Sequence, residues 1–363
     1  QAVSVLRSWN GSIPWGVSCR EMNIFLGFDF WNVPKGFDPR KDAKAEYALA
    51  CELYEELIPL ILKVELRRGE QETPFSKSAI QIQAVYGIET LLQILTALGK
   101  EPLLRGYARY GTSKPCVLSH LLKVSYPKEG ERGEDLKRAI KGTSITRKRL
   151  AEVAMYAPQW IPLLSECLNI PGLFSGCYYF MAHTAEWITE PMMAMIARYT
   201  PLSREELCDG AFALPWFFEA YKALGEKDFK LLYDAAKYSA VSSAHARARK
   251  YADAALGKTT YQALTEEIDK KRNKDLLMSL GLLPLPEEKE EKEAEILKRY
   301  QYILQYQKES RQFGAQRRVS EKRAADMAMQ NLSTNAGFDD VMRLVLRMEN
   351  QMLKEIQPYF LWQ

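Results

Sequence analysis

The sequence predicts an all-α protein, and two features support this prediction. Hydrophobic residues make up 47% of the 363 residues and charged residues 26%, a mixture typical of a chain that folds around an apolar core. Beyond the first 40 residues, apolar side chains recur at spacings of three and four, whereas the alternation typical of strands is absent. We therefore expect either an irregular multi-helix bundle or a degenerate helical-repeat array of the HEAT type, in which helices bury their apolar stripes against one another.

The first 100 residues are expected to form an irregular leader followed by helices. Residues 1–40 are rich in aromatic and turn-forming residues and show no helical period. Residues 41–100 are interpreted as an N-terminal helical segment, because apolar stripes at helical spacing predict one helix over 43–66 and a second over 76–98.

The next 45 residues differ from the segments on either side of them. Prolines and glycines interrupt any long period over residues 101–145, which predicts a loop-rich connection. The main helical domain is expected over 146–363, with one long charged helix at about 287–334 that can break near Gly314, and a final helix over 338–356. Before the long helix, shorter helices are predicted at roughly 145–157, 159–168, 173–187, 191–199, 203–224, 227–239, 241–256 and 261–280.

Composition and motifs exclude several classes of function. The excess of 50 lysines and arginines over 46 acidic residues is too small for a general polyanion binder. The glycine-rich nucleotide loops, the nucleophile elbow and the paired-histidine zinc motif are all absent, so we predict no cofactor and lean against an enzyme. Six cysteines are scattered singly and no apolar run reaches the ~18 residues of a membrane span, so a cytoplasmic protein without a membrane partner is expected.

One histidine has a neighbour that could share chemistry with it. His183 and Glu186 are three residues apart, which places both side chains on one face of a helix. Such a pair can supply two metal ligands or a general acid and base. The alternative is a hydrogen-bonded structural pair at a helix end, surrounded by aromatic residues. The pair is therefore a candidate catalytic or metal site, with no third ligand identified.

The charged segment changes sign along its length. Residues 287–295 hold six glutamates and two lysines, whereas residues 298–323 hold eight lysines and arginines and two glutamates. Tyrosines and a phenylalanine lie among the basic residues and could stack on bases. The alternative is a solvated helix whose cations pair with acidic side chains elsewhere. The candidate nucleic-acid or anion-binding residues are Arg311, Arg317, Arg318, Lys322 and Arg323, with Tyr302, Tyr306 and Phe313 as the stacking candidates.

Several longer segments of the sequence resemble a known protein family. They are Ala154–Trp160, Ala182–Glu186, Gly281–Pro286, Ser310–Arg318 and Asn335–Phe338. In this order they resemble large, uncharacterised bacterial proteins known as molybdate-metabolism-regulator-like, some of which carry a tryptophan-glycine-arginine (WGR) module. The resemblance covers most of residues 60–350 and departs from the family pattern at Val319 and Leu346. It implies a domain of unknown function that lies inside a longer chain, and the name implies no binding of molybdate.

These observations lead to three hypotheses of function. The first is a helical scaffold or interaction module of a larger multidomain bacterial protein, with neighbouring domains of the same protein or a separate protein as partners. The second is a nucleic-acid-associated regulatory module that uses the basic helix 298–323. The third is an enzyme or metal site at His183 and Glu186.

Overall fold

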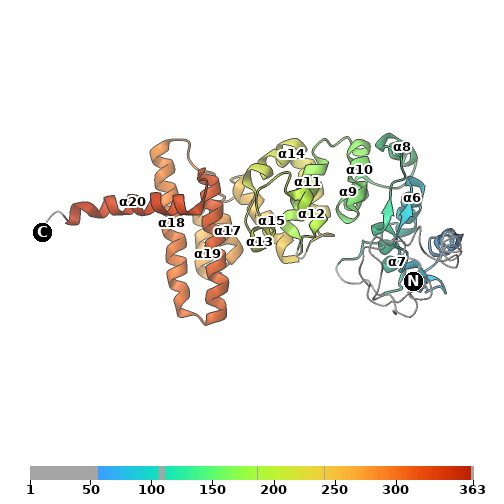
Figure 1. The fold of residues 1–363 in the computed structure, drawn as a ribbon, viewed down its shortest axis with the longest axis horizontal. Coiled ribbons are helices and arrows are strands. Elements are labelled where there is room, and N and C mark those ends of the chain that lie inside the picture. Colours follow the sequence, from blue (N-terminus) through green and yellow to red (C-terminus); the bar gives the residue numbers. More distant parts are fainter. Residues whose placement is uncertain (1–55, 106–110, 186, 241, 361–363) are drawn as a thin grey trace, which may run out of the picture. The chain divides into compact units, whose positions relative to one another are not determined.

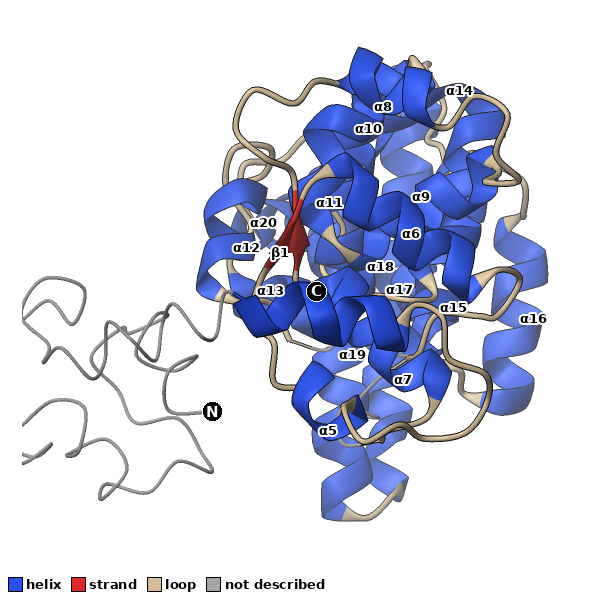
Figure 2. Ribbon diagram, turned by 90° about the vertical axis from the view of Figure 1, so that its right-hand side faces the viewer, coloured by secondary structure: helices blue, strands red, loops and turns tan. Residues whose placement is uncertain are grey.

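The computed structural model describes residues 56–105, 111–185, 187–240 and 242–360. The fold is all-α, as the spacing of apolar residues predicts, and Figure 2 shows how little of the described chain is strand. The chain divides into two units, residues 1–169 and 170–363, which are described separately below. Among the described helices, none combines the length and apolar character needed to cross a membrane.

The first unit packs short helices around a two-stranded parallel pair (Figure 1). Val85 lies opposite Ser125, and Tyr86 lies opposite Tyr126. Helix α8 packs against α6 and α10, and α6 also packs against α7. In chain order the elements are a helix over 56–65, α5 (Ser76–Ala79), β1 (Val85–Tyr86), α6 (Ile88–Leu98), α7 (Lys114–Lys123), β2 (Ser125–Tyr126), α8 (Gly133–Ala139), α9 (Arg147–Tyr156), the 3-10 turn η2 (Pro158–Trp160) and α10 (Ile161–Leu168).

Two segments of this unit differ from the predicted pattern. The single helix expected over 76–98 is interrupted, because Gly87 has a φ of 101° that helical backbone does not allow and the residues before it form β1. Residues 101–145, where prolines and glycines predict loops, contain α7 and α8. Pro115 lies in the first turn of α7, where its missing N–H costs no hydrogen bond, and Gly133 is the first residue of α8.

The second unit contains the longer helices (Figure 1). Helix α11 packs on α14, α17 packs on α19, and α18 and α19 form a hairpin. Its elements are α11 (Leu173–Thr184), α12 (Glu190–Ile196), α13 (Arg204–Asp209), α14 (Leu214–Ala236), α15 (Ser242–Ala255), α16 (Tyr261–Lys271), α17 (Lys274–Leu280), α18 (Lys289–Glu309), the 3-10 turn η3 (Ser310–Gln312), α19 (Ala315–Ala336) and α20 (Val341–Phe360).

Helix breaks in the second unit follow particular residues. Helix α14 bends at Gly225, whose φ of 69° and ψ of 167° are not helical, between the two helices that the sequence predicts there. The helix expected over 261–280 is in fact two, because Arg272 has a φ of 48° and ends α16, after which the Asn273 side chain caps α17. The long charged segment is interrupted between Glu309 and Ala315, around Gly314.

The part of the second unit's core between α11 and α14 is built largely from aromatic rings. Tyr179 and Phe180 of α11 contact Phe212, Trp216 and Phe229 before and within α14, with ring centroids between 5.0 and 6.2 Å apart. Most of these contacts are tilted or edge-to-face, which is the arrangement that the ring quadrupoles favour. His183, one of the candidate site residues, lies on the same helix and faces this cluster.

Candidate functional site

His183 lies among aromatic rings of the core. Its ring centroid is 4.8 Å from that of Tyr179 and 5.0 Å from that of Phe212, and only 4% of the residue is exposed. Burial, together with the positive charge of Arg247, lowers the pKa of His183 from 6.5 to about 3. The imidazole is therefore neutral near pH 7.

The partner predicted for this histidine, Glu186, lies outside the described residues, so the pairing of the two stays a prediction. Among the described residues, the His183 Nε2 and Tyr179 Oη atoms are buried and have no hydrogen-bond partner. Within the same part of the chain, no group of three or more histidine, cysteine or acidic side chains is placed to hold a metal ion.

The basic candidates lie around the turn between α18 and α19. Three of the five have acidic partners. Arg317 Nε donates to Glu321 at 2.8 Å, Lys322 lies 2.7 Å from Asp326, and Arg323 lies 3.3 Å from Asp209. Arg311 and Arg318 are exposed and have no ion pair within the described part of the chain. These two arginines are therefore available to a phosphate without the loss of an existing contact.

The aromatic side chains near the turn are already in use. The guanidinium carbon of Arg272 lies 3.9 Å from the ring centroid of Tyr306, which is 3% exposed. The guanidinium carbon of Arg317 lies 3.6 Å from the ring centroid of Phe313. Tyr302 Oη donates a hydrogen bond to Asp269 at 2.6 Å. Because the chain's own arginines and carboxylate occupy these side chains, they are poor platforms for stacking a base.

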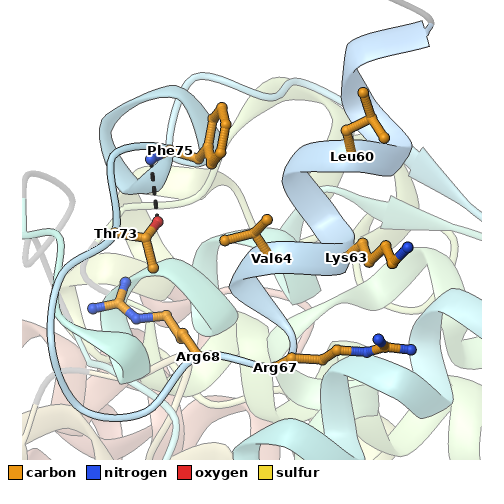
Figure 3. Close-up of a pocket in the computed structure, with 7 residues that line it drawn as sticks. All are labelled: Leu60, Lys63, Val64, Arg67, Arg68, Thr73 and Phe75. Atoms are coloured by element: carbon orange, nitrogen blue, oxygen red, sulfur yellow. Dashed lines mark hydrogen bonds between the residues drawn. The ribbon is translucent and has the colours of Figure 1, made fainter.

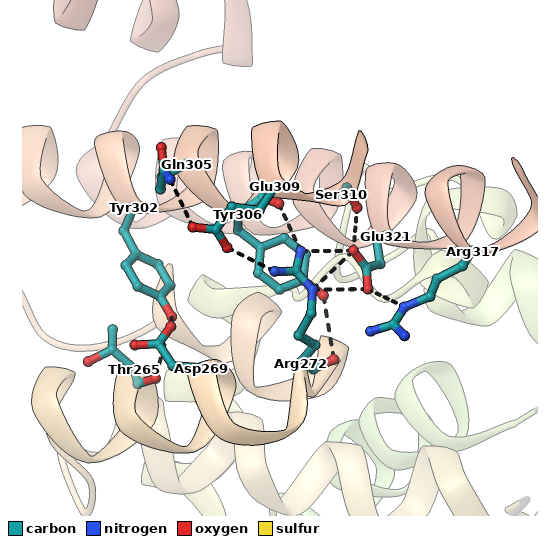
Figure 4. A network of polar contacts seen from close by, with 10 residues as sticks. All are labelled: Thr265, Asp269, Arg272, Tyr302, Gln305, Tyr306, Glu309, Ser310, Arg317 and Glu321. Carbon is teal, nitrogen blue, oxygen red and sulfur yellow. Dashed lines mark hydrogen bonds and ion pairs between the residues drawn. The ribbon is translucent and has the colours of Figure 1, made fainter. Parts of the chain in front are cut away.

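Behind the turn lies a polar network that the sequence pattern did not reveal (Figure 4). Arg272 donates hydrogen bonds to Glu321, to Glu309 and to the Tyr306 carbonyl oxygen, and Ser310 Oγ also donates to Glu321. Burial opposes the charge on Glu321, but hydrogen bonds from Arg272, Ser310 and Arg317 outweigh it and lower the Glu321 pKa to about 2. The network fixes the turn and the C-terminal end of α16 to α19.

Helix α20 has apolar residues on two opposite sides. Leu344 and Met348 are fully buried, and α20 packs against α18 and α19. Met342, Leu346 and Leu353 are 65%, 60% and 64% exposed, and their spacing of four and seven residues places them on one face. We call these three residues the outer stripe. An exposed face of this kind on a helix is typical of a protein-binding surface.

Comparisons with known proteins identify a family without a described function. No curated protein matches the chain, and no solved structure matches it. The sequence model of one family, described as a family of unknown function (DUF5724), matches residues 32–348 of the 363. This match spans most of the chain, including the basic turn and the first part of α20, and nothing in it refers to molybdate or to a WGR module. The chain therefore belongs to the family of unknown function DUF5724.

Proposed function

We propose that this chain is a helical scaffold or interaction module of a larger, cytoplasmic, multidomain bacterial protein, and that α20 docks a helix of a neighbouring domain through the outer stripe. The exposure of Met342, Leu346 and Leu353 on one helical face is the observation that carries the proposal. These side chains are already partly buried, so burying the rest of each would contribute about 1–2 kcal/mol, enough in sum for a stable docked arrangement inside one polypeptide.

The likeness to molybdate-metabolism-regulator-like proteins is part of this proposal, because such chains place this region beside other domains, in some cases a WGR module. A cofactor is not needed for the proposed role.

The test is a photo-crosslinking amino acid at Leu346 in the full-length protein. We expect a cross-link within the same polypeptide to a segment outside residues 1–363, located by mass spectrometry. The same amino acid at exposed Lys289 of α18 is the control and should not give this product. Docking on a neighbouring domain would be contradicted if all cross-links from position 346 fell within residues 1–363 or joined two copies of the protein.

A second candidate function is nucleic-acid binding at the turn between α18 and α19, supported by the two arginines without acidic partners, Arg311 and Arg318. Fluorescence anisotropy with a labelled single-stranded oligonucleotide at two salt concentrations tests it. The double variant Arg311→Glu/Arg318→Glu should weaken binding. It should also make the plot of log binding constant against log salt concentration less steep, by about 0.7 for each lost phosphate contact.

The matched control for this experiment is Lys227→Glu/Lys230→Glu, which reverses the same amount of charge at two exposed positions of α14. Equal weakening in both double variants would mean that only the net charge of the protein matters, and the turn would not be a binding site.

A further inference from the structure

A hollow in the first unit lies between the helix over 56–65 and the loop that follows it (Figure 3). Its volume is about 670 Å³, which is within the range of pockets that hold small organic molecules. Three apolar and three cationic side chains line most of it. The apolar ones are Leu60, Val64 and Phe75, and the cationic ones are Lys63, Arg67 and Arg68.

The apolar side of the hollow is exposed to solvent. Leu60 is 57% exposed and Phe75 is 40% exposed, although both are large hydrophobic residues. Leu60 and Val64 are four residues apart on the helix and so lie on the same face, and Val64 extends toward the side of the hollow on which Phe75 lies (Figure 3). A ligand with an apolar body would remove these side chains from water, which is favourable at roughly 25 cal/mol per Å².

The charge around the hollow has one sign. Lys63 and Arg67 are exposed, and neither has an acidic partner among the residues that the structure describes. No acidic side chain lines the hollow. Glu65 lies nearby, but it is fully buried and its oxygens accept hydrogen bonds from Arg68, Ser76 and Thr73. The field at the hollow therefore favours a negatively charged group.

Arg68 is a buried cation with unused donors. The residue is 7% exposed, and its Nη1 donates to Glu65, to Ser76 and to the Thr112 carbonyl oxygen. Its Nε and Nη2 are buried and have no hydrogen-bond partner within the described residues. Because both nitrogens are closed off from solvent, a ligand in the hollow does not reach them, and Arg68 contributes only its positive charge. Figure 3 shows the Arg68 guanidinium on the other side of the helix end from the charged ends of Lys63 and Arg67, so an anion that contacts Lys63 and Arg67 does not touch Arg68.

We propose that this hollow is a binding site for an amphipathic organic anion, whose carboxylate lies by Lys63 and Arg67 and whose apolar body covers Leu60, Val64 and Phe75. The site is independent of the outer stripe and of the basic turn, since both lie in the second unit. Neither the spacing of apolar residues nor the family match points to it.

Titration calorimetry with 4-phenylbutyrate at low ionic strength tests the site. We expect saturable binding of one molecule, and about tenfold or greater weakening with 4-phenylbutan-1-ol, which has the same apolar body without the charge. The double variant Lys63→Glu/Arg67→Glu should weaken 4-phenylbutyrate binding by at least as much. Leu60→Ser should weaken both the acid and the alcohol, because it removes part of the apolar wall.

The matched control is Lys77→Glu/Lys100→Glu, which reverses two exposed lysines of the same unit that do not line the hollow. The four changed lysine and arginine side chains are all exposed, so both double variants should fold, and circular dichroism verifies this. The proposal is overturned by the absence of saturable binding, by equal affinity for the acid and the alcohol, or by equal weakening in the two double variants.

Discussion

Arg272 and Glu321 form an enclosed ion pair between the end of α16 and α19, with 2.8 Å between Nη2 and Oε2. The two side chains are 13% and 3% exposed, so water screens the pair little. Glu321 has two further donors, Arg317 and Ser310, which together satisfy both of its oxygens. Each partner also has contacts of its own, because Glu321 keeps the hydrogen bonds from Arg317 and Ser310 without Arg272, and Arg272 keeps contacts to Glu309 and Tyr306 without Glu321.

Replacing Arg272 should destabilise the second unit. We expect Arg272→Ala to lower the free energy of unfolding by about 1.5–3 kcal/mol, because Glu321 loses a charged partner in a buried position but keeps Arg317 and Ser310. Urea denaturation followed by circular dichroism measures the change. Arg343→Ala is the control, since Arg343 pairs with Asp339 where both side chains are mostly exposed, and its cost should stay below about 1 kcal/mol. Similar losses in the two variants would contradict this account of the network.

Glu321 should also make the protein sensitive to acid. Its pKa is about 2 in the folded chain against an ordinary value of 4.5, so the unfolded chain takes up the proton first as the pH falls. The stabilisation by this group is complete above pH 4.5 and is lost between pH 4.5 and about 2. Urea denaturation of wild type and Glu321→Gln across this range should give stabilities that converge at low pH. A difference that stays constant would show that the charge of Glu321 is not what stabilises the network.

Protonation of His183 should affect the stability of the fold at higher pH than protonation of Glu321 does. Its folded pKa of about 3 is below the ordinary value of 6.5, so protonation below pH 6.5 favours the unfolded chain. Stability should fall as the pH decreases from 6.5 toward 3, by at most about 1.4 kcal/mol for each pH unit. The variant His183→Phe suits the surrounding rings and should make stability less dependent on pH between 6.5 and 5. An unchanged slope in this variant would mean that another group titrates there.

Close packing of α17 against α19 should make one glycine sensitive to a single methyl group. A Cβ on Gly281 would lie 2.6 Å from the Leu332 nitrogen and 2.7 Å from the Ala328 carbonyl oxygen, and backbone atoms cannot move aside as a flexible side chain can. We expect Gly281→Ala to cost about 1–3 kcal/mol in thermal or urea unfolding. Gly69→Ala is the control, because no atom lies within 4 Å of its added Cβ, and it should be neutral or slightly stabilising.

The sequence predicts the helical class because that class follows from the spacing of apolar residues along the chain. The same spacing does not predict the break between α16 and α17 at Arg272. A left-handed arginine is unfavourable by itself and is held by contacts with Glu321, 49 residues away, which a local pattern does not contain. Asn273 followed by Asp275 was the available signal, since Asn273 caps the next helix.

The contacts of the candidate site residues could not be predicted from local sequence either. The sequence places basic and aromatic residues together at the turn, but not which of them pair with one another. Tyr306 and Phe313, two of the candidates for stacking, contact arginines of the chain itself. The burial of His183 depends on Phe212 and Trp216, which belong to other segments and come close only in the folded unit.

Asn331 of α19 links distant parts of the second unit, with a consequence for the order in which the unit folds. Its Oδ1 accepts a hydrogen bond from the Phe212 backbone nitrogen, 119 residues away, and its Nδ2 donates to the Met278 carbonyl oxygen, 53 residues away. Closing the shorter loop costs less chain entropy, and contacts between neighbouring helices form fastest. We therefore expect α16–α19 to assemble first, before the hydrogen bond from the Phe212 nitrogen to the Asn331 oxygen forms. Joining of α19 to the segment around Phe212 would then follow as a later step.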